Sequence, residues 1–187
     1  MIARFLKQKI ARILLFLMGR WKTVDSELPK EGGVIIFYPH TSNWDTFFYL
    51  MYGWHRGERY CFFSKKELFF FPLKYLLKAI GSSPTGAEAN VVDTSIEFLK
   101  NNKRGFVVLT PEGTRRKVKR WRKGFYRIAV GANVPICLGF ANYETKTVGI
   151  SEYIQPTGNF DEDYHRILEW YAKNDIQGKY KELMMDC

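Results

Sequence analysis

Two short runs of β-branched and aromatic residues constrain the fold of this chain more than any other feature. Residues 33–38 read Gly-Val-Ile-Ile-Phe-Tyr, and residues 105–110 read Gly-Phe-Val-Val-Leu-Thr. Continuous apolar runs of this length are typical of strands buried in the middle of a sheet. Each run is followed by a proline, so a polar loop is expected to begin where each predicted strand ends.

Other strand-like and helical stretches alternate along the chain. Strand-like runs lie near 59–64, 134–142 and 147–154, and helical stretches lie near 43–54, 66–79, 90–101 and 160–173. Alternation of this kind predicts an α/β fold. No linker or repeat divides the 187 residues, so we expect a single-domain mixed sheet flanked by helices over residues 21–187. Beyond Gln177 the tail is expected to be loosely held.

The loop after the first predicted strand carries a histidine and a carboxylate, His40 and Asp45. A spacing of five separates side chains by about 140° on a regular helix, so the two meet only if His40 precedes the first turn. Ser42 is a suitable N-cap for a helix that begins after it. A carboxylate held against an imidazole favours a general base near neutral pH. Ser42 and Asp45 alternatively form only a capping box.

The loop after the second strand reads Pro-Glu-Gly-Thr-Arg, from Pro111 to Arg115. Strand ends of open α/β sheets are where ligand sites are built, so both loops can converge on one crevice. The two loops resemble the two main motifs of the glycerolipid acyltransferase family, His-x-x-x-x-Asp and Pro-Glu-Gly-Thr-Arg. Weaker matches lie at 66–68, 71–72, 80–81 and 134–136. The resemblance covers about residues 33 to 140 and implies that His40 is the general base and Asp45 its orienting partner.

The resemblance also implies the substrates. It predicts transfer of a fatty acyl group from a thioester, acyl-CoA or acyl carrier protein, to the free hydroxyl of a lysophospholipid. The expected acceptor is 1-acylglycerol-3-phosphate, which gives phosphatidic acid in phospholipid biosynthesis, and no further cofactor is expected. Family members carry an arginine shortly after the position of Gly81, but residues 82–87 contain none. An acceptor without phosphate is therefore an alternative. A second alternative is a non-catalytic protein that binds anionic membranes through a basic N-terminal helix and the basic run at 115–123.

A dense basic run follows the second motif, and the chain carries a net charge of +10. Such density predicts an anionic partner: acceptor phosphate, donor phosphate, acyl carrier protein or anionic lipid. No nucleic-acid-binding pattern accompanies it. The family resemblance implies that Glu112 and Arg115 contact the acceptor, and we expect Gly113, Thr114, Arg116 and Lys117 to bind it with them.

Residues 1–20 have the pattern of an amphipathic basic helix. Leu6, Ile10, Ile13 and Leu17 fall on one arc, whereas Gln8 and Arg12 fall on another. The apolar stretch is too short to span a bilayer, so we expect a peripheral helix on the cytoplasmic face of an anionic membrane. The alternative is a terminal helix folded onto the domain's own core.

The cysteines and remaining histidines suggest no further chemistry. Cys61 and Cys137 lie in strand-like runs and are expected to be buried, reduced thiols. His55 and His165 lack metal-ligand spacing and are expected at the surface. The sequence therefore predicts no metal site.

Overall fold

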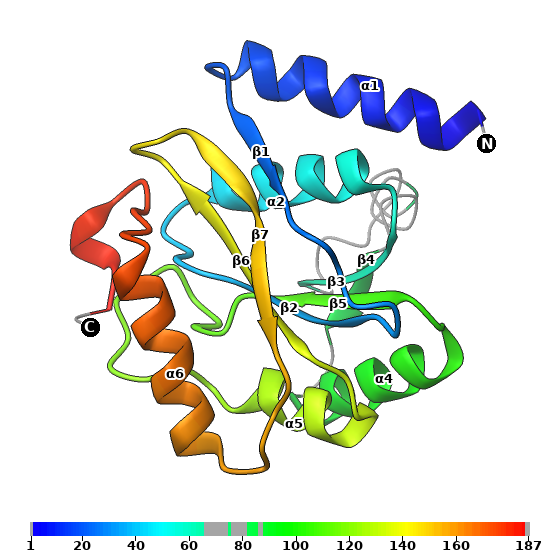
Figure 1. Cartoon of the computed structure of the whole chain (residues 1–187), viewed down its shortest axis with the longest axis vertical. Coiled ribbons are helices and arrows are strands. Elements are labelled where there is room, and N and C mark those ends of the chain that lie inside the picture. Colours follow the sequence, from blue (N-terminus) through cyan, green and yellow to red (C-terminus); the bar gives the residue numbers. More distant parts are fainter. Residues whose placement is uncertain (1, 66–74, 76–81, 86–87, 186–187) are drawn as a thin grey trace.

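The computed structural model describes residues 2–65, 75, 82–85 and 88–185 (Figure 1). The helix predicted over 66–79 lies outside the described residues except for Tyr75. The strands are β1 (Lys22–Asp25), β2 (Gly33–Phe37), β3 (Arg59–Lys65), β4 (Ser82–Thr85), β5 (Gly105–Leu109), β6 (Ile136–Asn142) and β7 (Thr147–Ile154). The helices are α1 (Ile2–Leu17), α2 (Asn43–Arg56), α4 (Glu88–Asn101), α5 (Gly124–Ala132), α6 (Phe160–Lys173) and the short 3₁₀ helix η2 (Lys181–Leu183).

The strands form one seven-stranded sheet in the order β1-β7-β6-β2-β5-β3-β4. All neighbouring pairs are parallel except β6 and β7, which form the predicted late hairpin. The mixed α/β sheet expected from the sequence is confirmed. The sequence analysis missed the two edge strands, β1 and β4, because each has only four residues and neither has a strong apolar pattern.

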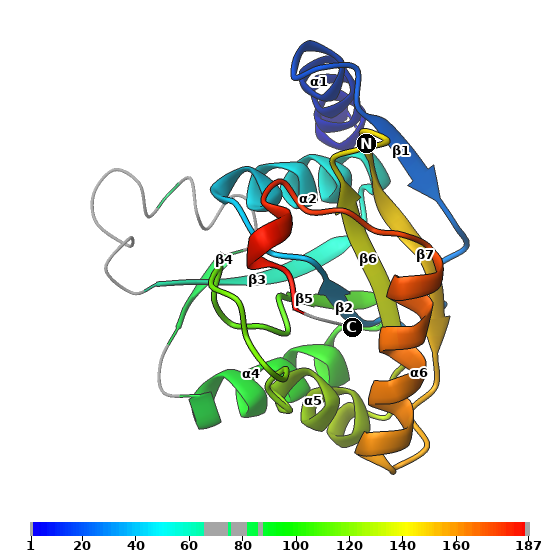
Figure 2. The same ribbon diagram turned by 90° about the vertical axis from the view of Figure 1, so that its left-hand side faces the viewer.

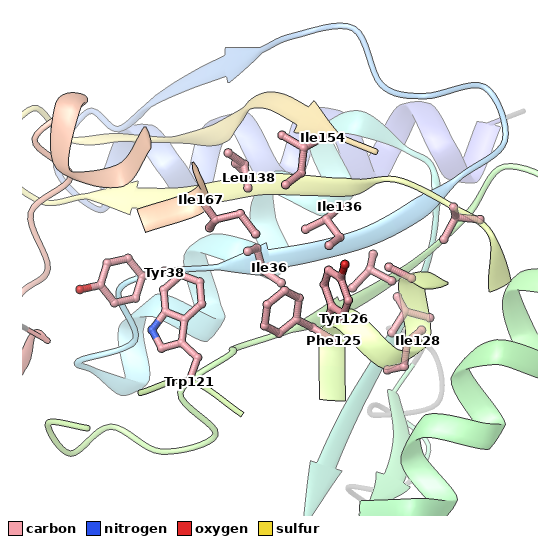
Figure 3. Close-up of a cluster of buried hydrophobic side chains, with 14 of the residues drawn as sticks. Ile36, Tyr38, Trp121, Phe125, Tyr126, Ile128, Ile136, Leu138, Ile154 and Ile167 are labelled. Carbon is pink, nitrogen blue, oxygen red and sulfur yellow. The ribbon is translucent and has the colours of Figure 1, made fainter. Parts of the chain in front are cut away.

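Strand β2 lies at the centre of the sheet, and its side chains alternate between two cores. Val34 and Ile36 pack with α4, α5 and α6, whereas Ile35 and Phe37 pack with α1 and α2. Figure 2 shows these two helical layers on opposite faces of the sheet, and Figure 3 shows the first core. All five residues of β2 are buried, which explains why the sequence reads as a continuous apolar run.

Strands β2 and β5 are parallel neighbours, with Ile35 opposite Val108. Their carboxyl ends therefore lie at the same edge of the sheet. The loops that carry the two predicted motifs leave from this edge, so the fold brings both motifs to one place.

The C-terminal segment, residues 176–185, corrects the expectation of a loosely held tail. Ile176 and Met185 are buried, and the main-chain N–H of Tyr143 donates to the carbonyl of Gln177 over 2.9 Å. The segment thus runs along the sheet edge where the motif loops lie.

Helix α1 extends over most of the predicted N-terminal helix, and Ala11 and Leu15 pack it against the domain. The division at residue 20 between a surface helix and the acyltransferase domain stays a prediction. No helix in the described ranges is long and apolar enough to cross a bilayer.

Candidate active site

The two motif loops are joined by a hydrogen bond at the end of β2. The main-chain N–H of His40 donates to Oε2 of Glu112 over 2.9 Å. Because Glu112 is only 3% exposed, the bond is shielded from water and fixes one loop against the other.

Asp45 is the most heavily bonded side chain of the site and is fully buried. Its Oδ2 accepts the main-chain N–H groups of Thr41 and Ser42, each over 2.7 Å. The hydroxyl of Tyr143 donates to Oδ1 over 2.6 Å. Helix α2 begins with the predicted capping box, in which Ser42 is the N-cap and Asp45 reaches back to the N-cap N–H.

The same carboxylate also faces the imidazole of His40. Nδ1 of His40 lies 3.3 Å from Oδ2 of Asp45, yet Nδ1 makes no hydrogen bond of good geometry with any described residue. Catalytic hydrogen bonds are often long without bound substrate. Capping and contact with His40 are therefore compatible roles of one side chain, and the two interpretations of Asp45 do not exclude each other.

The pKa of Glu112 is raised from 4.5 to about 8. Burial is the main cause, the N–H of His40 acts in the opposite direction, and the negative charge of Asp45 adds to the rise. A carboxyl group with this pKa is largely protonated at neutral pH. Protonation limits the repulsion between Glu112 and Asp45 beside the imidazole.

An apolar pocket of about 440 Å³ opens beside His40. Its walls come from β3, β5, α2, α4 and α5 and the loop around Pro111. The lining residues are His40, Thr46, Tyr49, Phe62, Phe63, Val91, Val92, Val108, Leu109, Thr110, Pro111, Gly113, Arg122, Gly124, Phe125 and Ile128. Most of these side chains are hydrocarbon or aromatic, which suits an extended apolar ligand.

A second pocket of about 490 Å³ lies at the N-terminus of α2. It is lined by residues 41–44, 114–116, Lys179 and Tyr180. Arg115 donates through Nη1 to Oδ1 of Asn43. His40 and Gly113 line the first pocket, and the residues that follow them, Thr41 and Thr114, line the second, so the two pockets adjoin at the two motif loops.

The structure therefore brings most of the predicted site residues together. His40, Asp45 and Glu112 are in contact, Gly113 lines the apolar pocket, and Thr114, Arg115 and Arg116 line the second. Gly113 has a φ of 64°, a conformation that favours glycine in this turn. Lys117 lines neither pocket.

Sequence analysis missed three residues near the site, namely Tyr143, Lys179 and Tyr180. All three follow the second motif by more than twenty positions, outside any recognisable pattern. Within the described ranges, no three His, Cys, Asp or Glu side chains are grouped closely enough to hold a metal ion.

Comparison with known proteins agrees with this geometry. The sequence model of the family named Acyltransferase matches residues 22–137, a range that contains both motif loops and most of the chain. This protein therefore belongs to the acyltransferase family and is an acyltransferase, which confirms the predicted resemblance. No curated protein matches it.

A solved structure with the same fold is the 1-acyl-sn-glycerophosphate (LPA) acyltransferase, PlsC, from Thermotoga maritima. The two chains are 20% identical, and the match covers 92% of this chain and 76% of that one with a TM-score of 0.64. At this identity the likeness is evidence for the fold.

Proposed function

We propose that this enzyme transfers a fatty acyl group from a thioester to the free hydroxyl of a lysophospholipid, with 1-acylglycerol-3-phosphate as the preferred acceptor. The observation that carries the proposal is that His40 lines an apolar pocket, and that this pocket adjoins, at Thr41, a second pocket lined by Arg115, Arg116 and Lys179. An acyl chain and a phosphate are the ligands that two such pockets would hold.

In this proposal His40 acts as the general base. Its imidazole takes the proton of the acceptor hydroxyl while the hydroxyl oxygen attacks the thioester carbonyl carbon. The tetrahedral intermediate collapses, the carbon–sulfur bond breaks, and the thiolate leaves with the proton returned from His40. Asp45 orients the imidazole and stabilises its positive charge while it carries the proton.

Glu112 and Arg115 are proposed to act on the acceptor, as the family motif implies. Since Glu112 also accepts the main-chain N–H of His40, we assign it a second role in holding the base in place. Arg115 is exposed in the second pocket and is free to pair with a phosphate through its second guanidinium nitrogen.

Acyl transfer assays with defined substrates test this proposal. We expect faster acylation of lysophosphatidate than of monoacylglycerol, with either acyl-CoA or acyl carrier protein as donor. Arg115→Ala should raise the KM for lysophosphatidate by about tenfold to a hundredfold, the contribution of a charge-assisted contact. If only the KM for the donor rises, the basic run serves the donor's phosphates. Equal rates with both acceptors would contradict the choice of lysophosphatidate.

We further propose that the outward face of α1 binds the cytoplasmic face of a membrane. The polar side chains Gln8, which is half-buried, and Arg12, which is exposed, both lie toward the domain, since they donate to the carbonyl and to Nδ1 of His55. The residues on the opposite side are apolar and between 56% and 71% exposed: Phe5, Leu6, Ile13, Phe16 and Leu17. An exposed apolar helical face beside basic residues is the pattern of an interfacial helix.

Vesicle binding tests this second proposal. Ile13→Ser with Leu17→Ser should reduce binding to vesicles that contain anionic lipid, and Val130→Ser, at a residue 48% exposed elsewhere, should not. Substitution is preferable to deletion of residues 1–20, because Ala11 and Leu15 belong to the core. Unchanged vesicle binding by the double variant would contradict the proposal.

A further inference from the structure

The C-terminal segment (residues 176–185) forms one wall of the second pocket. The main-chain N–H of Tyr180 donates to Oγ1 of Thr41 over 3.3 Å. Gly178 approaches Thr41 so closely that an added Cβ would lie 2.9 Å from its side chain. Residues 178–180 are thus held against the turn that carries His40 and Asp45, although they are nearly 140 positions away in the chain.

Lys179 extends from this wall between two aromatic rings of the pocket. Its Nζ lies 5.9 Å from the ring centre of Trp44 and 5.5 Å from that of Tyr180. Cation–π contacts at these distances hold an ammonium group in place and leave its N–H donors available.

The described carboxylates do not balance the positive charges in the pocket. Among the described residues, no carboxylate lies within ion-pair distance of Arg115, Arg116 or Lys179. Two cations just outside the pocket on the same two segments do have carboxylate partners: Arg120 pairs with Asp161, and Lys181 pairs with Glu144 over 3.0 Å. Three cations around one pocket, none of them with a carboxylate partner in the described part of the chain, would be stabilised by an anionic ligand.

We infer that Lys179 is a specificity-determining residue that binds the phosphate of the acceptor together with Arg115 and Arg116. This inference rests on the proposed function and adds to it a residue outside the family motifs. Residues 82–87 lack the arginine that family members carry after the position of Gly81, and Lys179 supplies a cation from the other end of the chain. The ammonium group of a lysine, on its flexible side chain, can replace one of the N–H donors of a guanidinium in binding phosphate.

The test compares Lys179→Gln with Lys181→Gln, which removes an equal charge two residues along the same segment. The KM values for lysophosphatidate, monoacylglycerol and acyl donor are measured, together with equilibrium binding of glycerol 3-phosphate in the absence of donor. Lys179→Gln should raise the KM for lysophosphatidate about tenfold and weaken glycerol 3-phosphate binding by a similar factor. Lys179→Arg should restore both, and Lys181→Gln should change neither.

Unchanged binding of glycerol 3-phosphate by Lys179→Gln, or an equal loss in Lys181→Gln, would overturn the inference. A rise confined to the KM for the acyl donor would also overturn it, because the pocket would then hold the donor's phosphates. Failure of the proposed function gives a different result: the wild-type protein would acylate neither acceptor. The binding comparison needs no acyl transfer and decides the role of Lys179 in that case as well.

Discussion

The described residues include two histidine–aspartate pairs, and the pair of His40 and Asp45 lies beside the two pockets described above. Nε2 of His55 lies 2.7 Å from Oδ2 of Asp25, closer than the 3.3 Å between His40 and Asp45. Arg12 donates to the other nitrogen of His55. Both nitrogens of His55 are therefore engaged by the protein, whereas the imidazole of His40 lines the apolar pocket.

The comparison shows that a short contact between imidazole and carboxylate does not by itself indicate catalysis. His55 is buried where α2, β1 and α1 meet, and it links these elements. The sequence-based expectation that His55 lies at the surface is wrong. Its partner, Asp25, lies thirty positions earlier in the chain, and the residues around His55 do not indicate this contact. His165 is exposed as expected and lies 3.1 Å from Glu169.

The largest expected effect separates the two histidines. His40→Ala should lower kcat by at least about a hundredfold, the usual loss when a general base is removed, and leave the circular dichroism spectrum unchanged. His55→Ala should instead lower the melting temperature, because it removes the links between α1, α2 and β1, and should leave kcat per folded molecule near wild type. A folded His40→Ala protein with normal turnover would remove the base from the mechanism.

Glu112 contacts His40, a member of the first pair. The raised pKa of Glu112 predicts that the stability of the protein depends on pH. Its folded-state pKa, about 8, lies above its ordinary value of 4.5, so the folded protein retains a proton that the unfolded chain releases between these pH values. This contribution to stability is complete below about pH 4.5 and is lost as the pH rises through 8.

Glu112→Gln cannot titrate, and its amide oxygen can still accept the N–H of His40. Urea denaturation should therefore show that, between pH 5 and pH 8, the free energy of unfolding of the variant rises relative to that of the wild type by roughly a few kcal/mol. If the free energies of unfolding of the two proteins change with pH in the same way, Glu112 is ionised in the folded protein.

The next effect separates the two aspartates. Asp45→Asn keeps one oxygen for the main-chain donors of the capping box but loses the charge that stabilises the imidazolium, so kcat should fall by about tenfold to a hundredfold. Asp25→Asn makes a matched change in the other pair and should leave kcat unaltered. Loss of stability without loss of rate in Asp45→Asn would leave Asp45 as a helix cap only.

The smallest effect concerns the tyrosine that supports Asp45. Tyr143→Phe removes the donor to Oδ1 and leaves this buried oxygen unpaired, so kcat should fall by about fivefold as the carboxylate reorients. Tyr126 donates to the buried carboxylate of Asp163 over 2.7 Å. Neither of these residues lines either of the two pockets, so Tyr126→Phe is the matched control. If both variants lose the same stability and neither loses rate, Tyr143 has no part in positioning Asp45.

Local patterns were sufficient to predict the centre of the fold and the motif loops. Strands β2 and β5 are buried on both faces, so their sequences are continuous apolar runs. The capping box of α2 involves Ser42 and Asp45, which are only three positions apart. His40, Asp45 and Glu112 were predicted because short motifs bring them to strand ends that parallel pairing places at one edge.

Tertiary structure alone decided the contacts that cross the chain. Tyr143 reaches Asp45 over 98 positions, and Lys179 enters the second pocket because the C-terminal segment packs against Thr41. It also decided that the polar arc of α1 faces His55 and the apolar arc faces outward. The sequence determines periodicity, caps and motifs because these depend on neighbouring residues. Which surfaces pack together depends on the free energy of the whole chain, and no local pattern records it.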